Sequence, residues 1–77
     1  MPPRLIALLS RVFAVPADSI RADSGPQDLA KWDSAGHMHL VVELEKQFGV
    51  QFDDEEVVEM ISPAAIAAIL ARRGVRG

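Results

Sequence analysis

The chain has 77 residues, no cysteine, 49% hydrophobic residues and a net charge of −3. This length allows a single small domain, residues 1–77. Without cysteine there is no disulfide and no thiolate metal site, so packing must stabilise the fold. The apolar run from Leu5 to Leu9 is too short for a signal peptide, and no segment reaches transmembrane length. We therefore expect a cytoplasmic protein.

The acidic residues are concentrated in the middle of the chain. Residues 18–59 contain all eleven Asp and Glu and three basic residues, a net charge of −8, while five arginines lie outside this range. Nucleic-acid binding requires clustered Lys and Arg, so the pattern argues against a nucleic-acid surface. Two interpretations remain: a solvated acidic surface, or a docking face for basic partner proteins.

Hydrophobic spacing predicts a first helix from Pro3 to Val15, because proline is tolerated in a first helical turn. Pro16 disfavours helical geometry at the residue before it and ends the segment. Residues 16–32 then form a long connection, which is unusual in a compact domain and often functional. We expect a short helical turn after Pro26. Three apolar residues should hold this connection against the core, namely Ile20, Leu29 and Trp32.

The second helix should start at Asp33 or Ser34 and end at Phe48, because Gly49 suits the position after a helix. At 100° per residue, one arc faces the core and contains Leu40, Leu44, Phe48, Val41 and His37. A second apolar strip lies beside Ser34 and consists of Met38, Val42 and Ala35. Together they cover about 220°, more than one core stripe needs. The surplus is either covered by neighbouring helices or exposed as a docking patch.

A third, short helix should follow Asp53 or Asp54 and end near Met60 or Ile61. Asp53 and Glu56 stand in capping-box spacing.

A fourth helix should be capped by Ser62, begin at Pro63 and stop at Gly74. Its buried stripe should contain Ile66, Ile69 and Leu70. The sequence therefore predicts an all-α fold, a small four-helix bundle with three longer helices and a short third one.

Ser34 has two interpretations at the start of the second helix. Ser and Asp before an apolar helix are ordinary capping residues. Alternatively, Ser34 is covalently modified, because a helix N-terminus offers free N–H groups and the positive end of the dipole to an attached phosphodiester. A hydroxyl at the end of a long loop is also accessible to another enzyme.

Four segments of the sequence, taken in chain order, together form one recognisable motif pattern. Residues 32–40 read Trp-Asp-Ser-Ala-Gly-His-Met-His-Leu, and residues 44–52 read Leu-Glu-Lys-Gln-Phe-Gly-Val-Gln-Phe. The acidic segment 53–57 and the Ser-Pro-Ala-Ala-Ile segment 62–66 follow. In this order they resemble the acyl carrier protein family, whose attachment motif is usually Asp-Ser-Leu. The Trp-Asp-Ser-x-Gly-His variant is similar to freestanding carriers of specialised biosynthetic pathways.

The resemblance implies that a phosphopantetheinyl transferase attaches 4′-phosphopantetheine from coenzyme A to Ser34, which Asp33 would help to present. The terminal thiol would carry an acyl or aminoacyl group as a thioester between biosynthetic enzymes with basic docking surfaces. The chain itself would be a monomeric carrier and not an enzyme. The resemblance also implies partner-facing positions, namely Ala35, Met38, His39, Val42, Glu45, Asp54, Glu55 and Glu56.

Three residues near Ser34 depart from the family pattern. Ala35 stands where leucine is usual, Gly36 replaces a common acid, and His39 sits where glutamate is common. Gly36 also weakens a helix by about 1 kcal/mol relative to alanine. These changes predict a dedicated set of partner enzymes rather than exchange with general fatty-acid enzymes.

Three other functions were weighed against the carrier. Asp33, Ser34 and His37 could form a hydrolytic site, but so small a bundle has little room for an oxyanion hole and a pocket. His37 fits better as a partly buried histidine with a satisfied nitrogen. His37 and His39 point about 200° apart on a helix, and the acids at 53–56 lack the pattern of a calcium loop, so we expect no metal site. An unmodified acidic interaction module of the same fold remains the alternative.

Overall fold

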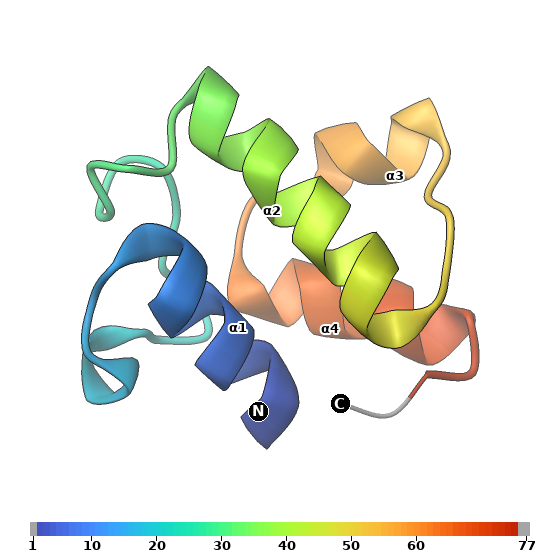
Figure 1. Cartoon of the computed structure of the whole chain (residues 1–77), viewed down its shortest axis with the longest axis horizontal. Helices are drawn as coiled ribbons and strands as arrows, with labels where there is room; N and C mark the ends of the chain where they lie inside the picture. The colour runs from blue at the N-terminus through green and yellow to red at the C-terminus, as the bar shows by residue number, and fades with distance from the viewer. Residues whose placement is uncertain (1, 76–77) are drawn as a thin grey trace.

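The computed structural model describes residues 2–75. Within them the elements in chain order are α1 (Pro3–Phe13), the short 3-10 helix η1 (Ala17–Ser19), α2 (Ser34–Phe48), α3 (Asp54–Glu59) and α4 (Pro63–Arg72). This is the predicted all-α architecture, in which α1, α2 and α4 are the longer helices and α3 is short (Figure 1). None of the helices described is long and apolar enough to cross a membrane.

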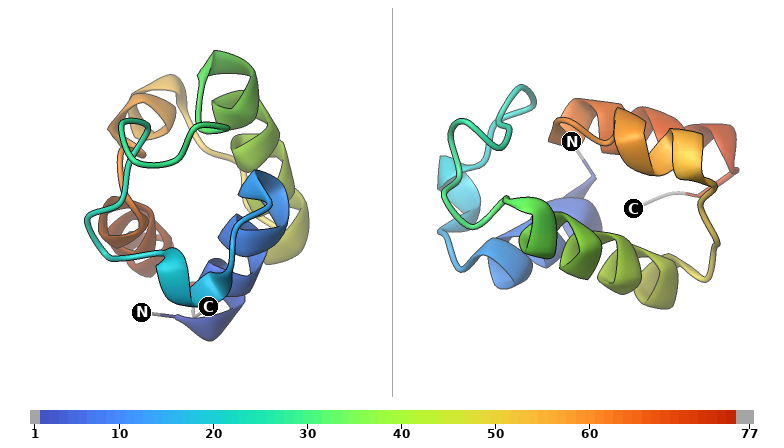
Figure 2. Two further views of the ribbon diagram at one scale, coloured as in Figure 1. Left: turned by 90° about the vertical axis from the view of Figure 1, so that its left-hand side faces the viewer. Right: turned by 90° about the horizontal axis from the view of Figure 1, so that it is seen from above.

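The long connection between α1 and α2 covers one end of the bundle, as the end-on view of Figure 2 shows. Its three predicted anchors are buried, namely Ile20, Leu29 and Trp32. After Pro26 the chain makes one turn, closed by a hydrogen bond of 3.0 Å from the Leu29 N–H to the Gly25 carbonyl. The 3-10 helix η1 was not expected from the sequence. The connection is therefore an ordered, anchored segment that delivers the chain to the start of α2.

The end of α1 differs from the prediction. The helix stops at Phe13 and not at Val15, because Ala14 adopts a left-handed conformation with φ of 55°. The N–H of Val15 then donates to the carbonyl of Ser10 at 3.2 Å, which closes the last turn. Left-handed backbone is uncommon for alanine, so hydrophobic spacing gave no sign of it.

Capping side chains determine where the later helices begin. The Asp33 carboxylate accepts a hydrogen bond of 2.8 Å from the Gly36 N–H at the start of α2. Asp53 and Glu56 form the predicted capping box of α3. The Ser62 hydroxyl accepts from the Ala65 N–H at 3.1 Å at the start of α4. Each of these starts agrees with the prediction, because capping depends on neighbours three residues away.

The predicted helix ends are also close to those of the structure. Gly49 follows α2 in a left-handed conformation with φ of 66°, as expected for a residue after a helix. α3 ends at Glu59, one residue before the predicted limit, and α4 ends at Arg72, before Gly74.

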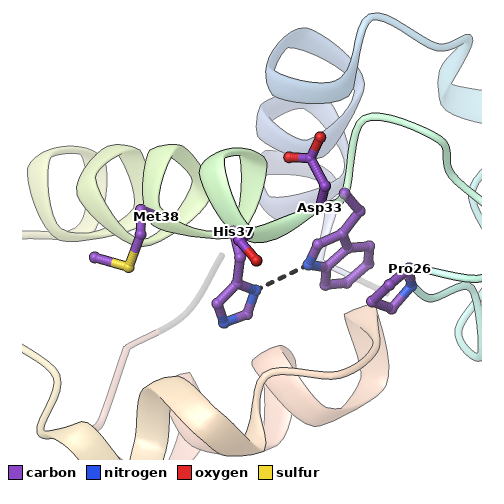
Figure 3. Close-up of a pocket in the computed structure, with 6 residues that line it drawn as sticks. Pro26, Asp33, His37 and Met38 are labelled. Atoms are coloured by element: carbon purple, nitrogen blue, oxygen red, sulfur yellow. Dashed lines mark hydrogen bonds between the residues drawn. The ribbon is translucent and has the colours of Figure 1, made fainter.

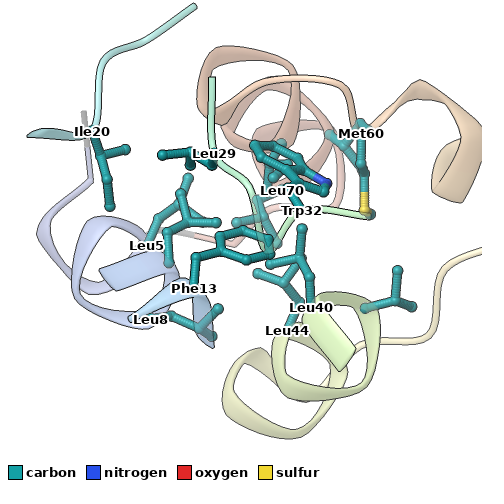
Figure 4. Close-up of a cluster of buried hydrophobic side chains, with 14 residues drawn as sticks. Leu5, Leu8, Phe13, Ile20, Leu29, Trp32, Leu40, Leu44, Met60 and Leu70 are labelled. Carbon is teal, nitrogen blue, oxygen red and sulfur yellow. The ribbon is translucent and has the colours of Figure 1, made fainter. Parts of the chain in front are cut away.

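Side chains from α1, α2, α4 and the long connection form one hydrophobic core (Figure 4). The Trp32 ring stacks on Phe13, with ring centroids 5.0 Å apart. The predicted core arc of α2 supplies three buried side chains, Leu40, Val41 and Leu44. The predicted stripe of α4 is buried as well, namely Ile66, Ile69 and Leu70. Trp32 thus couples the core to the residues immediately before Ser34.

Candidate functional site

Ser34 is the first residue of α2 and is exposed. The residue before it, Asp33, is the helix cap, so the cap interpretation applies to Asp33 and not to Ser34. Within residues 2–75 no hydrogen bond engages the Ser34 hydroxyl, and the amide N–H groups of Ser34 and Ala35 lie in the first turn, where a helix lacks internal acceptors. The structure therefore places a free hydroxyl at the positive end of a 15-residue helix.

Gly36 is required by the way the chain enters α2. A Cβ atom at this position would lie 1.9 Å from the carbonyl oxygen of Lys31, a backbone atom that cannot move aside independently. The loop before Ser34 therefore packs directly against the first turn of α2. Sequence reasoning treated Gly36 as the loss of a common acid and of helix stability, although a glycine inside a well-patterned helix can also indicate such a close approach.

An open groove of about 540 Å³ lies beside Ser34 (Figure 3). Its lining comes from the long connection and the first turns of α2, namely Pro26, Trp32, Asp33, Ser34, His37 and Met38. Most of these side chains present carbon atoms to the groove. A flexible group attached to Ser34 would start at its rim.

His37 is engaged at both ring nitrogens. The indole N–H of Trp32 donates to His37 Nδ1 at 2.9 Å, and His37 Nε2 lies 2.8 Å from the carbonyl oxygen of Val57 in α3. This confirms the prediction of a partly buried histidine with satisfied polar atoms. The contact to Val57 was not foreseen, because the two residues lie 20 positions apart in the sequence.

Four large apolar side chains are exposed, two on α2 and two on or just after α3. On α2, Met38 and Val42 are 56% and 46% exposed, so the surplus strip predicted from the helical arc is not covered by neighbouring helices. Val58 and Ile61 are 75% and 65% exposed and were missed by the sequence analysis. No clear signal in the sequence marked them, since Val57 and Met60 in the same segment are equally apolar but lie against or within the core. We call these four residues the apolar patch.

The polar residues predicted to face partners lie in different settings. Ala35 and His39 are exposed, and His39 Nε2 lies 3.9 Å from Glu43 Oε2. Asp54 and Glu55 are exposed in the first turn of α3. The carboxylate of Glu45 instead accepts a hydrogen bond of 2.9 Å from the Phe52 N–H, so it also holds the loop after α2.

Glu56 requires a correction, because it does not lie on an exposed acidic face. It is only 9% exposed, and its carboxylate accepts hydrogen bonds from the Arg73 guanidinium and from the Asp53 N–H. The hydrogen bond from Arg73 holds the pKa of Glu56 below its usual value, burial opposes this effect, and the Asp53 N–H adds to it. Glu56 therefore joins α3 to α4 within the molecule.

No group of three or more metal-ligating side chains is assembled anywhere in the described part of the chain. His37 faces Trp32 and α3, whereas His39 lies exposed beside Glu43.

The family comparison covers most of this arrangement. A family model described as a phosphopantetheine attachment site matches residues 3–70, which include Ser34 and nearly all of the four helices. No individual curated protein matches the chain. The resemblance to acyl carrier proteins is thus confirmed, and the chain belongs to the phosphopantetheine-attachment family, with 4′-phosphopantetheine as its covalent cofactor.

Proposed function

We propose that Ser34 bears the phosphopantetheine and that the chain carries an acyl or aminoacyl group between enzymes of a specialised biosynthetic pathway. The observation that carries this proposal is the state of the serine hydroxyls. Ser34 has an exposed hydroxyl with no partner among residues 2–75, at the first position of a long helix and at the rim of the open groove.

The other four serines have structural roles. The hydroxyls of Ser10 and Ser19 donate to backbone carbonyls, of Val15 and Pro16 respectively. Ser24 is buried and its hydroxyl accepts from the Arg21 N–H. The remaining one, Ser62, caps α4. Modification of any of these four would break a contact that holds the fold, whereas modification of Ser34 breaks none.

The start of α2 suits an attached phosphodiester. Asp33 takes up the N–H of Gly36, which leaves the N–H groups of Ser34 and Ala35 directed out of the first turn. These donors and the positive helix end stabilise a negative charge without a basic side chain. Asp33 contributes by fixing the first turn, and so holds the Ser34 hydroxyl at a constant place.

In the attachment step, the Ser34 oxygen attacks the phosphorus that bears the pantetheine arm of coenzyme A. A Ser34 O–P bond forms, the pyrophosphate P–O bond breaks, and the hydroxyl proton passes to a base of the transferase. The nucleotide part of coenzyme A leaves. When bound, the arm supplies a terminal thiol that holds the cargo as a thioester. The chain needs no catalytic group of its own for these events.

The surface around Ser34 supports transient docking of basic partners. The apolar patch provides area for contact, and Asp54 and Glu55 lie exposed beside Val58 on α3. Charge steers association without requiring high affinity, which suits a protein that must leave each enzyme after transfer. A Ser–His hydrolase is less well supported, because both nitrogens of His37 are engaged by Trp32 and Val57.

Intact-mass spectrometry after incubation with coenzyme A and a promiscuous phosphopantetheinyl transferase tests the proposal. The wild-type chain should gain one phosphopantetheine, Ser34→Ala should gain none, and the exposed-serine control Ser19→Ala should gain one. If the wild type gains nothing, the unmodified interaction module becomes the better description. If Ser34→Ala is still loaded, the attachment residue is wrong.

A further inference from the structure

The hydrogen bonds of His37 connect three parts of the chain that surround Ser34. Trp32 belongs to the connection before α2, His37 to the second turn of α2, and Val57 to α3. The rings of Trp32 and His37 are nearly parallel, with an interplanar angle of 14° and centroids 6.3 Å apart. Figure 3 shows His37 directed away from its helix, with its hydrogen bond to the indole drawn as a dashed line.

The donors and acceptors allow only one form of the imidazole. The indole nitrogen of Trp32 can only donate, so His37 Nδ1 must be the unprotonated acceptor. The carbonyl of Val57 can only accept, so His37 Nε2 must carry the proton and donate. The neutral ring with its proton on Nε2 satisfies both contacts at once. Either alternative, the Nδ1–H tautomer or the doubly protonated ring, directs an N–H at the N–H of the indole.

The Val57 contact matters because α3 is short. Six residues make a helix that depends on its neighbours for its position. Its packing is mainly on α4, where Arg73 holds Glu56. Within residues 2–75, the bond from His37 to Val57 is the hydrogen bond that joins α2 directly to α3. The same carbonyl also accepts a hydrogen bond of 3.3 Å from the Met60 N–H, so His37 is its second donor.

The bond joins the residues that precede two members of the surface proposed for docking. Met38 follows His37 on α2, and Val58 follows Val57 on α3, and both are exposed members of the apolar patch. The position of Val58 relative to Met38 and Ser34, which both lie on α2, therefore depends on the His37–Val57 bond.

We propose that His37 is a positioning residue for the modification of Ser34. Its neutral imidazole holds the connection before α2 through Trp32, and α3 through Val57, at fixed positions relative to Ser34. This inference rests on the proposed function at Ser34. His37 touches neither cofactor nor substrate in this role. It acts by keeping the two halves of the apolar patch at one spacing, so that a partner meets a preformed surface.

The first test is independent of loading. Long-range ¹H–¹⁵N NMR of the ¹⁵N-histidine-labelled wild-type chain should show His37 with an unprotonated Nδ1 and a protonated Nε2 at neutral pH. Trp32→Phe keeps a ring but removes the indole N–H, while the Val57 carbonyl still requires a proton on Nε2, so the tautomer should stay and the ¹⁵N shift of Nδ1 should change because this nitrogen loses its donor. A wild-type His37 in the Nδ1–H form, or an Nδ1 shift unaffected by Trp32→Phe, would overturn the proposed bridge.

The second test measures loading kinetics of Ser34. His37→Leu removes both bonds and should raise KM for the transferase about fivefold, the effect of losing the one bond that holds α3, with kcat unchanged. His37→Gln keeps a side-chain N–H for Val57 and should recover part of the loss. The buried-core variant Ile69→Val controls for reduced stability and should retain the wild-type KM. Wild-type KM in His37→Leu would overturn the positioning role.

Hydrogen exchange separates this proposal from the proposed function. The amides of α3 should exchange faster in His37→Leu than in Ile69→Val at equal global stability. If the wild-type chain accepts no phosphopantetheine, the function at Ser34 fails, and the exchange and tautomer results alone decide whether His37 positions α3. Unchanged exchange in His37→Leu would overturn the positioning of α3 even in a chain that is loaded normally.

Discussion

Gly36 illustrates how a single residue can serve a site that its helix propensity argues against. Glycine disfavours a helix relative to alanine by about 1 kcal/mol, so propensity alone predicts that Gly36→Ala stabilises the chain. The structure predicts the opposite, because the new methyl group would lie 1.9 Å from the Lys31 carbonyl oxygen. The loop that delivers Ser34 would have to move away from α2.

We therefore expect Gly36→Ala to lower the free energy of unfolding by roughly 1–3 kcal/mol, as overpacking does. Urea unfolding followed by circular dichroism measures it. Gly49→Ala is the comparison, because nothing lies within 4 Å of its Cβ position and its penalty comes from the left-handed φ alone. A Gly36→Ala chain more stable than wild type would mean that the loop before Ser34 is not held against the helix.

Glu56 makes stability depend on pH in a predictable direction. Because its pKa is lowered in the folded chain, folding favours the charged carboxylate. This contribution is complete above the ordinary value of 4.5, which applies in the unfolded chain, and declines as pH falls from there through the lowered folded pKa. Below the folded pKa it is absent.

Thermal unfolding at a series of pH values between 7 and about 2 checks this dependence of stability on the charge of Glu56. Glu56→Gln should be less stable than wild type at neutral pH, and the difference should shrink as pH falls through that window. Glu59→Gln is the matched control, since Glu59 is exposed and pairs with Arg72 at 3.3 Å on the surface. A constant difference between Glu56→Gln and wild type at all pH values would contradict the role of the Arg73 contact.

At the scale of elements, one side of α3 packs against the rest of the protein and the other side faces solvent. Glu56 and the Val57 carbonyl face inward, to Arg73 and His37. Asp54, Glu55 and Val58 face outward. The acidic segment that the sequence presented as uniform therefore divides between holding the helix and facing solvent, and only the second group is available to partners.

Reversing the outward charges should slow loading without unfolding the helix. We expect Asp54→Lys with Glu55→Lys to lower the association rate with a basic transferase, and the loss should shrink at high salt. Helicity should change little, since acids in a first turn contribute about 0.3–1 kcal/mol each. Stopped-flow loading at several ionic strengths measures the rate.

The control for that experiment reverses the same number of charges in the long connection between α1 and α2. Asp18→Lys with Asp23→Lys reverses two exposed acids of the long connection, which lie outside the apolar patch. If both double variants slow loading equally, the overall charge of the chain and not the face of α3 would determine association.

The elements that sequence reasoning located correctly are those set by nearby residues. The caps at Asp33, Asp53 and Ser62 act over three positions, so the starts of α2, α3 and α4 could be read directly. The early end of α1 depends on left-handed backbone at Ala14, which no spacing rule indicates.

The contacts that organise the site were not predictable in the same way. Arg73 and Glu56 lie 17 positions apart, and His37 and Val57 lie 20 apart. These pairings exist only after α3 has packed on α4 and against α2. Sequence pattern could therefore identify Ser34 and its helix, but it could not separate Glu56 from its exposed neighbours or connect His37 to α3.

For the whole molecule, buried side chains stabilise the fold, whereas the exposed apolar patch and Ser34 serve the proposed function. The core holds its large side chains without the participation of Ser34 or the apolar patch, whose Val58 and Ile61 are 75% and 65% exposed. Apolar side chains left in water contribute little to stability, and exposed apolar surface suits an interaction site. Docking of partners would give these side chains a role that stability does not.

Val58→Ser combined with Ile61→Ser tests this separation. Because both side chains are exposed, the free energy of unfolding should stay within about 0.5 kcal/mol per substitution. The KM for loading of Ser34 should rise, because the partner loses apolar contact area, while kcat stays the same. Urea unfolding and loading kinetics are measured on the same preparation. An equal KM for the double variant and the wild type would remove α3 from the docking surface, and a large loss of stability would show that these side chains pack within the fold after all.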